Sequence, residues 1–212
     1  MNVETILVLA PHTDDAELGC GATIARLVEE GKKVFVAAFS TAEESLPPGM
    51  PPDTLKREFC EAMPILGVPL SQLSIYDFTV RRLSYHRQEV LDEMVSLRLE
   101  IKPDLVFLPS GHDLHQDHQV VHAEGLRAFK DMSIFGYELP WNHINFSAQA
   151  FFTLEKRHIE KKWEALQCYR SQSALDRLYL KKELIEGLAR VRGVQIKTEW
   201  AEAFEVIRWV IK

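Results

Sequence analysis

Two short clusters of polar residues contain the side chains in this sequence that could do chemistry together. They are HTDD at residues 12–15 and HDLHQDH at residues 112–118. Imidazole and carboxylate groups are ligands of zinc, and a catalytic zinc ion usually has three protein ligands and one position left for water. His12 and Asp15 are close enough in sequence to bind one ion, and a histidine of the second cluster could complete the set. Asp14 would then be free to accept a proton from the water, as a hydrolytic metal centre requires.

Each cluster also has a simpler structural explanation. Either acid of the first cluster could be the N-cap of the helix that follows, but this leaves the other acid and His12 unexplained. His115, His118 and His122 have the spacing of a solvated helix face, yet four of the eight histidines fall within residues 112–122. Both clusters follow predicted parallel strands. They would therefore meet at the carboxyl edge of one sheet, where open α/β sheets bind their ligands.

Strands and helices alternate along the predicted structure that positions these clusters. Residues 6–9 are apolar and rich in branched side chains, which is typical of a strand buried on both faces. A helical pattern follows and is closed by Gly31 as the predicted C′ residue. Further strands are predicted at 33–40, 73–78, 104–109, 148–154 and 204–211. Helices are predicted at 54–63, ended by Pro64, at 84–101, from the second cluster to residue 129, at 155–169 and at 175–189.

This alternation predicts a three-layer α/β/α, Rossmann-like fold with a mainly parallel sheet, in a single domain over residues 1–212. The net charge of −6 argues against a general nucleic-acid binder. No apolar run approaches the roughly 20 residues that cross a bilayer, and residues 1–4 lack the basic start of a signal peptide. Three cysteines with no CxxC motif predict neither a disulfide framework nor a thiolate zinc site. We therefore expect a cytoplasmic protein.

The two clusters resemble the two motifs of a known family. HTDDAELGCG at residues 12–21 resembles the (A/P)HPDDxxxGxGG signature of the PIG-L (LmbE-like) family of zinc-dependent N-acetylglucosaminyl deacetylases, and HQDH at residues 115–118 resembles its HxDH motif. LKRE at residues 55–58 is similar to the family's RREE stretch. Thr13 replaces the usual proline, which removes no ligand, and Ala22 stands where the family often has a second glycine.

The resemblance implies the role of each motif residue. It implies one zinc ion per chain, bound by His12, Asp15 and His118. It implies Asp14 as the general base, with His115 as an electrophilic or acid partner supported by Asp117. A site of two histidines and one aspartate also accepts iron, cobalt or manganese, so the sequence leaves the physiological metal open.

The resemblance also implies the substrate class. Arg57 and Asp77 lie where family members contact the substrate sugar. The expected activity is removal of the acetyl group from an N-acetylated amino sugar, a small-molecule N-acetylglucosaminyl conjugate, by water activated on zinc. The loops at residues 41–53 and 136–147 are expected to border the substrate and to determine its specificity, so the aglycone stays open.

Other functions are compatible with parts of the sequence. An amidase acting on another sugar or a thiol conjugate would use the same ligands, and a catalytically silent sugar-binding protein could have the same fold. A dinucleotide-binding protein is excluded, because Gly19 and Gly21 come too late after the first strand and Ile24 occupies a position that requires a small residue. These glycines are instead predicted to allow close helix packing. The state of assembly is open, and a homo-oligomer is compatible with four tryptophans that could be core or interface: Trp141, Trp163, Trp200 and Trp209.

Overall fold

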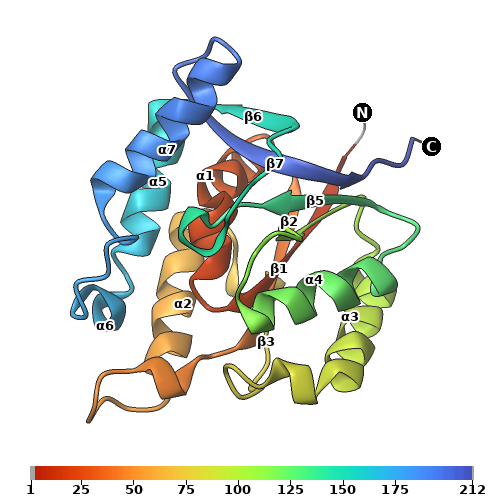
Figure 1. Ribbon diagram of the computed structural model, residues 1–212, viewed down its shortest axis with the longest axis vertical. Coiled ribbons are helices and arrows are strands. Elements are labelled where there is room, and N and C mark those ends of the chain that lie inside the picture. Colours follow the sequence, from red (N-terminus) through yellow and green to blue (C-terminus); the bar gives the residue numbers. More distant parts are fainter. Residues whose placement is uncertain (1–2, 212) are drawn as a thin grey trace.

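The structure, a computed structural model, describes residues 3–211. In this part of the chain seven strands form one sheet, in the order β3-β2-β1-β4-β5-β7-β6 (Figure 1). Their bounds are β1 Thr5–His12, β2 Lys33–Ser40, β3 Leu73–Ile75, β4 Leu105–Pro109, β5 Ser133–Tyr137, β6 Ala150–Leu154 and β7 Trp200–Arg208. The first five strands of this order are parallel, and β7 runs antiparallel to both β5 and β6. The predicted mainly parallel sheet is confirmed.

Helices cover both faces of the sheet and complete the predicted three-layer fold. Their bounds are α1 Asp15–Glu29, α2 Thr54–Ile65, α3 Arg87–Ile101, α4 Gln116–Ala128, α5 Lys156–Leu166, α6 Arg170–Ser173 and α7 Lys182–Gln195. In Figure 1, α1, α2, α5 and α7 lie on one side of the sheet, and α3 and α4 on the other. Alternate residues of β1 enter two separate cores, Ile6 and Val8 in one, Leu7 and Leu9 in the other. No helix within residues 3–211 has the length and apolar character needed to span a bilayer.

Several elements differ from the sequence prediction: α6 was not predicted, and β7 begins at Trp200 and not at 204. Pro64 lies inside α2, which ends one residue later at Ile65, so the proline interrupts only the end of the helix. Strand β5 was not predicted, since it is only five residues long and contains Gly136. Helix α7 begins at Lys182 and not at 175, so the chain between α6 and α7 is a loop. Residues of this loop line the cavity described below.

Helix α1 is bent at Cys20, whose φ of −148° is not helical. The bend follows Gly19, where a Cβ atom would lie 2.3 Å from a ring carbon of Tyr137. The prediction that these glycines allow close packing is therefore confirmed. Gly31, with φ of +80°, follows the last turn of α1 as predicted, and the next backbone N–H, that of Lys32, donates to the carbonyl of Leu27 in a Schellman motif.

Candidate active site

The two polar clusters converge because their strands are neighbours. His12 is the last residue of β1, and β4, which pairs with β1 in parallel, leads through a short loop to α4. The two clusters therefore leave the same edge of the sheet. The ring centroids of His12 and His115 are 4.9 Å apart, those of His12 and His118 are 5.2 Å apart, and those of His115 and His118 are 4.5 Å apart. Nitrogen atoms from all three rings lie within 4.8 Å of one another, as a shared metal ion would require.

The Oδ2 atom of Asp15 lies against two of these rings. It is 3.1 Å from Nδ1 of His12 and 3.3 Å from Nε2 of His118. Zinc–ligand bonds of 2.0–2.1 Å in tetrahedral geometry place neighbouring ligand atoms about 3.3 Å apart. The spacing of these donors therefore fits a tetrahedral ion, and their chemistry of two imidazoles and one carboxylate fits zinc. His115 could serve as an alternative imidazole ligand, since its ring belongs to the same cluster.

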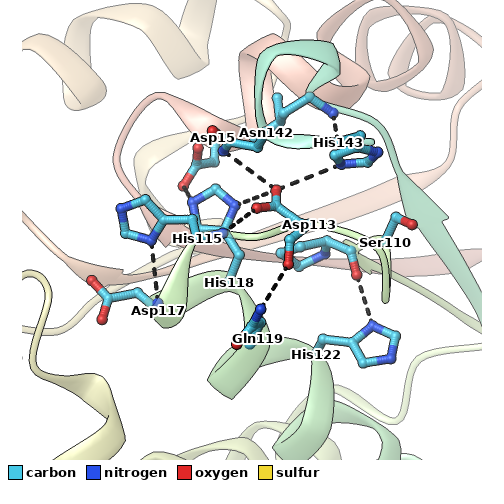
Figure 2. Close-up of polar contacts among 12 residues, drawn as sticks. Asp15, Ser110, Asp113, His115, Asp117, His118, Gln119, His122, Asn142 and His143 are labelled. Atoms are coloured by element: carbon cyan, nitrogen blue, oxygen red, sulfur yellow. Dashed lines mark hydrogen bonds and ion pairs between the residues drawn. The ribbon is translucent and has the colours of Figure 1, made fainter. Parts of the chain in front are cut away.

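Each of the two imidazole rings that face Asp15 is hydrogen-bonded to a second carboxylate through its other nitrogen. Nε2 of His12 is 2.9 Å from Oδ2 of Asp117. Nδ1 of His118 is 2.7 Å from Oδ2 of Asp113, a contact drawn in Figure 2. Such partners fix the orientation of a metal-binding imidazole and make it a better ligand. Burial alone would lower the pKa of both histidines. The carboxylates instead raise the pKa of His12 to about 9 and that of His118 to about 10.

Two of these contacts differ from the sequence prediction. The side chain of Asp117 was expected to support His115, but it pairs with His12 and also accepts the backbone N–H groups of Arg81 and Leu83. The cause is the helix start, where His115 accepts the backbone N–H of Asp117 and the aspartate side chain turns toward β1. The role of Asp113 was missed. Its position five residues before a predicted ligand, in a loop, gave no periodic signal.

Asp14 is the residue expected from the sequence to act as the general base. It is the N-cap residue of α1 by position, but its side chain makes no capping hydrogen bond. The side chain instead lines the cavity in front of the histidines. Burial and the neighbouring Asp15 carboxylate raise the pKa of Asp14 to about 6, which is suited to a base that works near neutral pH.

His115 presents its free nitrogen to the same cavity. Its Nδ1 accepts the backbone N–H of Asp117 at 3.2 Å, which places the proton of the neutral ring on Nε2. Burial and the charges of His118 and His12 lower the pKa of His115 to about 4. At neutral pH this ring is therefore an uncharged hydrogen-bond donor.

The cavity has a volume of about 300 Å³ and is bordered by loops from both halves of the chain. Ala42 and Ser45 come from the predicted 41–53 loop, and Trp141 and Asn142 from the predicted 136–147 loop. Helix α6 and the loop that follows it add three lining residues that the sequence did not predict: Gln172 from the helix, and Arg177 and Tyr179 from the loop. Arg177 and Tyr179 were missed because they fall within the helix predicted at 175–189, and Gln172 lies in the short segment between two predicted helices.

The structure does not bring Arg57 and Asp77 to the cavity. Arg57 is exposed and pairs with Asp53, because it lies on the outer side of α2, two residues from the inward-facing Leu55. Asp77 is exposed after β3, while the residues on either side of it pack inward. Arg81 lies at the cavity with its side chain half exposed, in a left-handed backbone conformation with φ of 64°.

Comparisons with known proteins agree with this site. The profile of the PIG-L family, described as GlcNAc-PI de-N-acetylase, matches residues 7–129. The uncharacterized deacetylase YaiS of Escherichia coli K12 is 28% identical over 171 residues, which are 78% of this chain and 90% of that protein. The conserved protein TT1542 of Thermus thermophilus is 25% identical, with a TM-score of 0.81 over 98% of this chain and 96% of that one.

Two further solved structures share the fold at 20% identity. N,N'-diacetylchitobiose deacetylase of Pyrococcus horikoshii has a TM-score of 0.80, covering 97% of this chain and 84% of its own. GalB of Pseudomonas putida KT2440, a 4-carboxy-2-hydroxymuconate hydratase, has a TM-score of 0.81, covering 99% and 98%. Because one fold carries both reactions, the reaction of this chain has to be argued from its site.

Proposed function

The chain belongs to the PIG-L deacetylase family, and from this premise we propose that it removes the acetyl group from an N-acetylated amino sugar by metal-assisted hydrolysis. His12, Asp15 and His118 are the proposed ligands, because their donor atoms have the spacing of a tetrahedral zinc site. Zinc bound there would polarise the amide carbonyl and make a water molecule more acidic. The proposed substrate is an N-acetylglucosaminyl conjugate, in keeping with the family description.

The remaining residues supply the proton transfers and the oxyanion contact. Asp14, whose carboxylate has no capping partner, accepts the proton of the attacking water. His115 donates Nε2–H to the oxygen on which negative charge develops, and it does so as a neutral ring. Asp14, once protonated, returns the proton to the leaving amine. Asp117 and Asp113 hold His12 and His118 in place and do not touch the substrate.

The observation that supports this proposal most directly is the separation of the two aspartates. Asp15 Oδ2 lies against two imidazoles, whereas Asp14, the next residue, lines the cavity with its pKa raised to about 6. One carboxylate thus has the environment of a ligand and the other that of a base. A silent sugar-binding protein would need neither. Hydrolysis of another amide conjugate would use the same residues. The two activities are therefore distinguished by measuring which substrates are turned over.

The test is a panel of N-acetylated sugars and thiol-sugar amides, incubated with zinc-reconstituted protein and assayed for free amine and acetate. We expect turnover of N-acetylglucosaminyl compounds. Asp14→Asn should bind the metal with unchanged stoichiometry and lose activity by on the order of 10²- to 10⁴-fold. Arg57→Gln, outside the cavity, is the matched control and should keep its activity. Turnover of metal-loaded Asp14→Asn at the wild-type rate would remove Asp14 as the base, and acetate release from no compound would refute the deacetylase proposal.

A further inference from the structure

One arginine in the cavity has a positive charge without an acidic partner. Arg177 lines the same cavity as Asp14 and His115 and is half-buried. Within the described residues no carboxylate oxygen lies within 4 Å of its guanidinium group, although the chain carries a net charge of −6. Its neighbour Asp176 is not available, because that carboxylate pairs with Lys181. Most other arginines of the chain do have acidic partners, among them Arg26, Arg81, Arg157 and Arg192.

The guanidinium group of Arg177 is held in place by neutral contacts. Its Nε donates to Oε1 of Gln172 at 2.9 Å, and Gln172 is itself buried, with 3% of its surface exposed. The guanidinium carbon lies 5.7 Å from the ring centroid of Tyr179, which in turn stacks on Trp141 at 4.6 Å. Nε is therefore used for positioning, and no group within residues 3–211 accepts a hydrogen bond from the two terminal nitrogens, which are left for another partner. A fixed guanidinium with both terminal nitrogens free is suited to bidentate binding of a carboxylate or phosphate.

We propose that Arg177 binds an anionic group on the substrate, a carboxylate or phosphate on the part of the molecule that remains when acetate is released. This inference rests on the proposed deacetylase function and narrows its substrate class to acidic conjugates. The Trp141–Tyr179 stack borders the same part of the cavity and provides a flat apolar wall beside the anion site. The acetamide group would lie toward His115, and the anionic group toward the α6–α7 loop.

A different role for the positive charge of Arg177 is to adjust the pKa of Asp14, the proposed base. Arg177 is close enough to Asp14 for its charge to lower the pKa of that carboxyl. If this were its only role, loss of the charge would shift the pH dependence for every substrate equally. Binding of an anion instead predicts that the effect depends on the substrate.

The experiment compares three substrates with zinc-reconstituted protein: methyl N-acetylglucosaminide, which is uncharged, a glycoside of N-acetylglucosamine with a carboxylate on the aglycone, and N-acetylglucosamine 1-phosphate. Arg177→Gln should raise KM for the preferred anionic substrate by on the order of 10- to 100-fold, the typical effect of losing a hydrogen bond to a charged group. The same substitution should change KM for the uncharged glycoside by no more than about twofold. The carboxylate and phosphate compounds identify which anion the site prefers.

Two variants keep the outcome interpretable. Arg177→Lys retains the positive charge but not the planar guanidinium that binds an anion through two nitrogens. Its affinity for the anionic substrate should therefore lie between those of Arg177→Gln and the wild type. Arg170→Gln removes an exposed arginine of α6 that pairs with Glu61, and should change no kinetic constant. Equal loss for charged and uncharged substrates in Arg177→Gln, or an equal shift of both pH profiles, would overturn the anion site. If no substrate is turned over, the deacetylase proposal fails separately, and the anion site is then tested by calorimetric binding of N-acetylglucosamine 1-phosphate to wild-type and Arg177→Gln protein.

Discussion

Three nitrogens surround one oxygen atom at the centre of the site. Oδ2 of Asp15 accepts the backbone N–H of His12 at 2.9 Å and faces Nδ1 of His12 and Nε2 of His118. Interaction with His118 and His12 keeps the pKa of Asp15 well below its usual value, although burial alone would raise it. In protein without metal, this oxygen therefore attracts two imidazolium protons. A divalent cation would compete for the same place.

Metal binding should consequently release protons. The pKa values of His12 and His118, about 9 and about 10, mean that both rings are protonated at pH 7 before an ion binds. Because only the neutral imidazole is a ligand, we expect about two protons released per ion and an affinity that falls as pH is lowered. Calorimetric titration with zinc in buffers of different ionisation enthalpy measures this number. His112→Asn, at an exposed histidine, should release the same number of protons. A binding enthalpy of wild-type protein that does not change with the ionisation enthalpy of the buffer would contradict the proposed ligands.

The pH dependence of the reaction should show an acid limb from Asp14. Its folded-state pKa of about 6 means that the carboxyl is increasingly protonated below pH 6 and cannot accept a proton. A bound cation nearby favours the charged form, so the limb should lie at or below pH 6. The observable is kcat/KM between pH 4.5 and 8, with metal content measured at each pH. A rate that stays constant down to pH 4.5 in metal-loaded protein would contradict Asp14 as the base.

The strand ends that carry the two polar clusters predicted that these clusters meet. The resemblance to the family then singled out His12, Asp14, Asp15, His115 and His118 within these clusters. Neither predicted the partners of these residues. The pairing of Asp117 with His12 depends on the direction that a side chain takes at the first turn of α4, and Asp113 lies in a loop with no periodic pattern. Such contacts follow from the packed structure, which motif spacing does not encode.

At the scale of elements, the bend in α1 is stabilised by a buried ion pair from the C-terminal part of the chain. Nζ of Lys162, on α5, donates to the carbonyl of Leu18 and lies 2.7 Å from Oε1 of Glu202, on β7. The carboxylate of Glu202 accepts the backbone N–H groups of Ala22 and Thr23, at the start of the second half of the helix. The pair thus replaces hydrogen bonds that the bend at Cys20 removes, and it caps the new helix start.

Removal of one partner of this pair should be costly. Lys162→Met leaves the buried Glu202 carboxylate without its ion partner, and we expect a loss of about 3–5 kcal/mol in the free energy of unfolding. Lys161→Met, one residue earlier and less buried, should stay within about 0.5 kcal/mol of wild type. Urea unfolding measures both.

The double variant Lys162→Met/Glu202→Leu separates this pair from an ordinary buried ion pair. Replacement of both charges by apolar groups is often neutral. Here it should remain destabilising by about 1–3 kcal/mol, because backbone groups at the bend of α1 lose their partners. A double variant as stable as wild type would show that the pair does not support the bend.

The sequence predicted most elements of the fold but not this interaction. Strong apolar runs determined β1, β2 and β4, and the signature glycines indicated close packing in α1. The bend lies next to Gly19, which packs against Tyr137 on β5, a strand too short to give a clear pattern. The loop with Arg177 was hidden in the same way, because its composition is compatible with helix.

At the scale of the whole molecule, the residues outside the matched family segment complete the site. The PIG-L profile matches residues 7–129, which hold both metal-binding motifs. Later residues line the cavity, among them Trp141 and Arg177, and Tyr169 lies against the turn that carries Asp14. Its hydroxyl is hydrogen-bonded to the carbonyl of Thr13 and lies 2.5 Å from Oε1 of Glu17. Global stability and the geometry of the site should therefore be linked through this contact.

Glu17 makes the stability of the whole molecule depend on pH. Its side chain is fully buried, Oε2 has no hydrogen-bond partner among the described residues, and burial raises the pKa of this carboxyl well above its usual value. The folded protein therefore holds a proton on Glu17 that the unfolded chain releases above about pH 4.5. Folding must take up this proton at higher pH, so the contribution of Glu17 to stability is largest below pH 4.5 and decreases as pH rises toward the folded-state pKa.

Glu17→Gln should remove this dependence, because the amide is neutral and similar in shape. The free energy of unfolding of the variant, relative to wild type, should be constant below pH 4.5 and should then rise with pH by up to about 1.4 kcal/mol per unit. Urea unfolding of both proteins from pH 4 to pH 8 gives this difference directly. Glu186→Gln, at a partly exposed carboxylate of α7, is the control and should give a difference that changes little with pH. A constant difference for Glu17→Gln across the range would mean that Glu17 is ionised in the folded protein, with Tyr169 donating to it and not to Thr13.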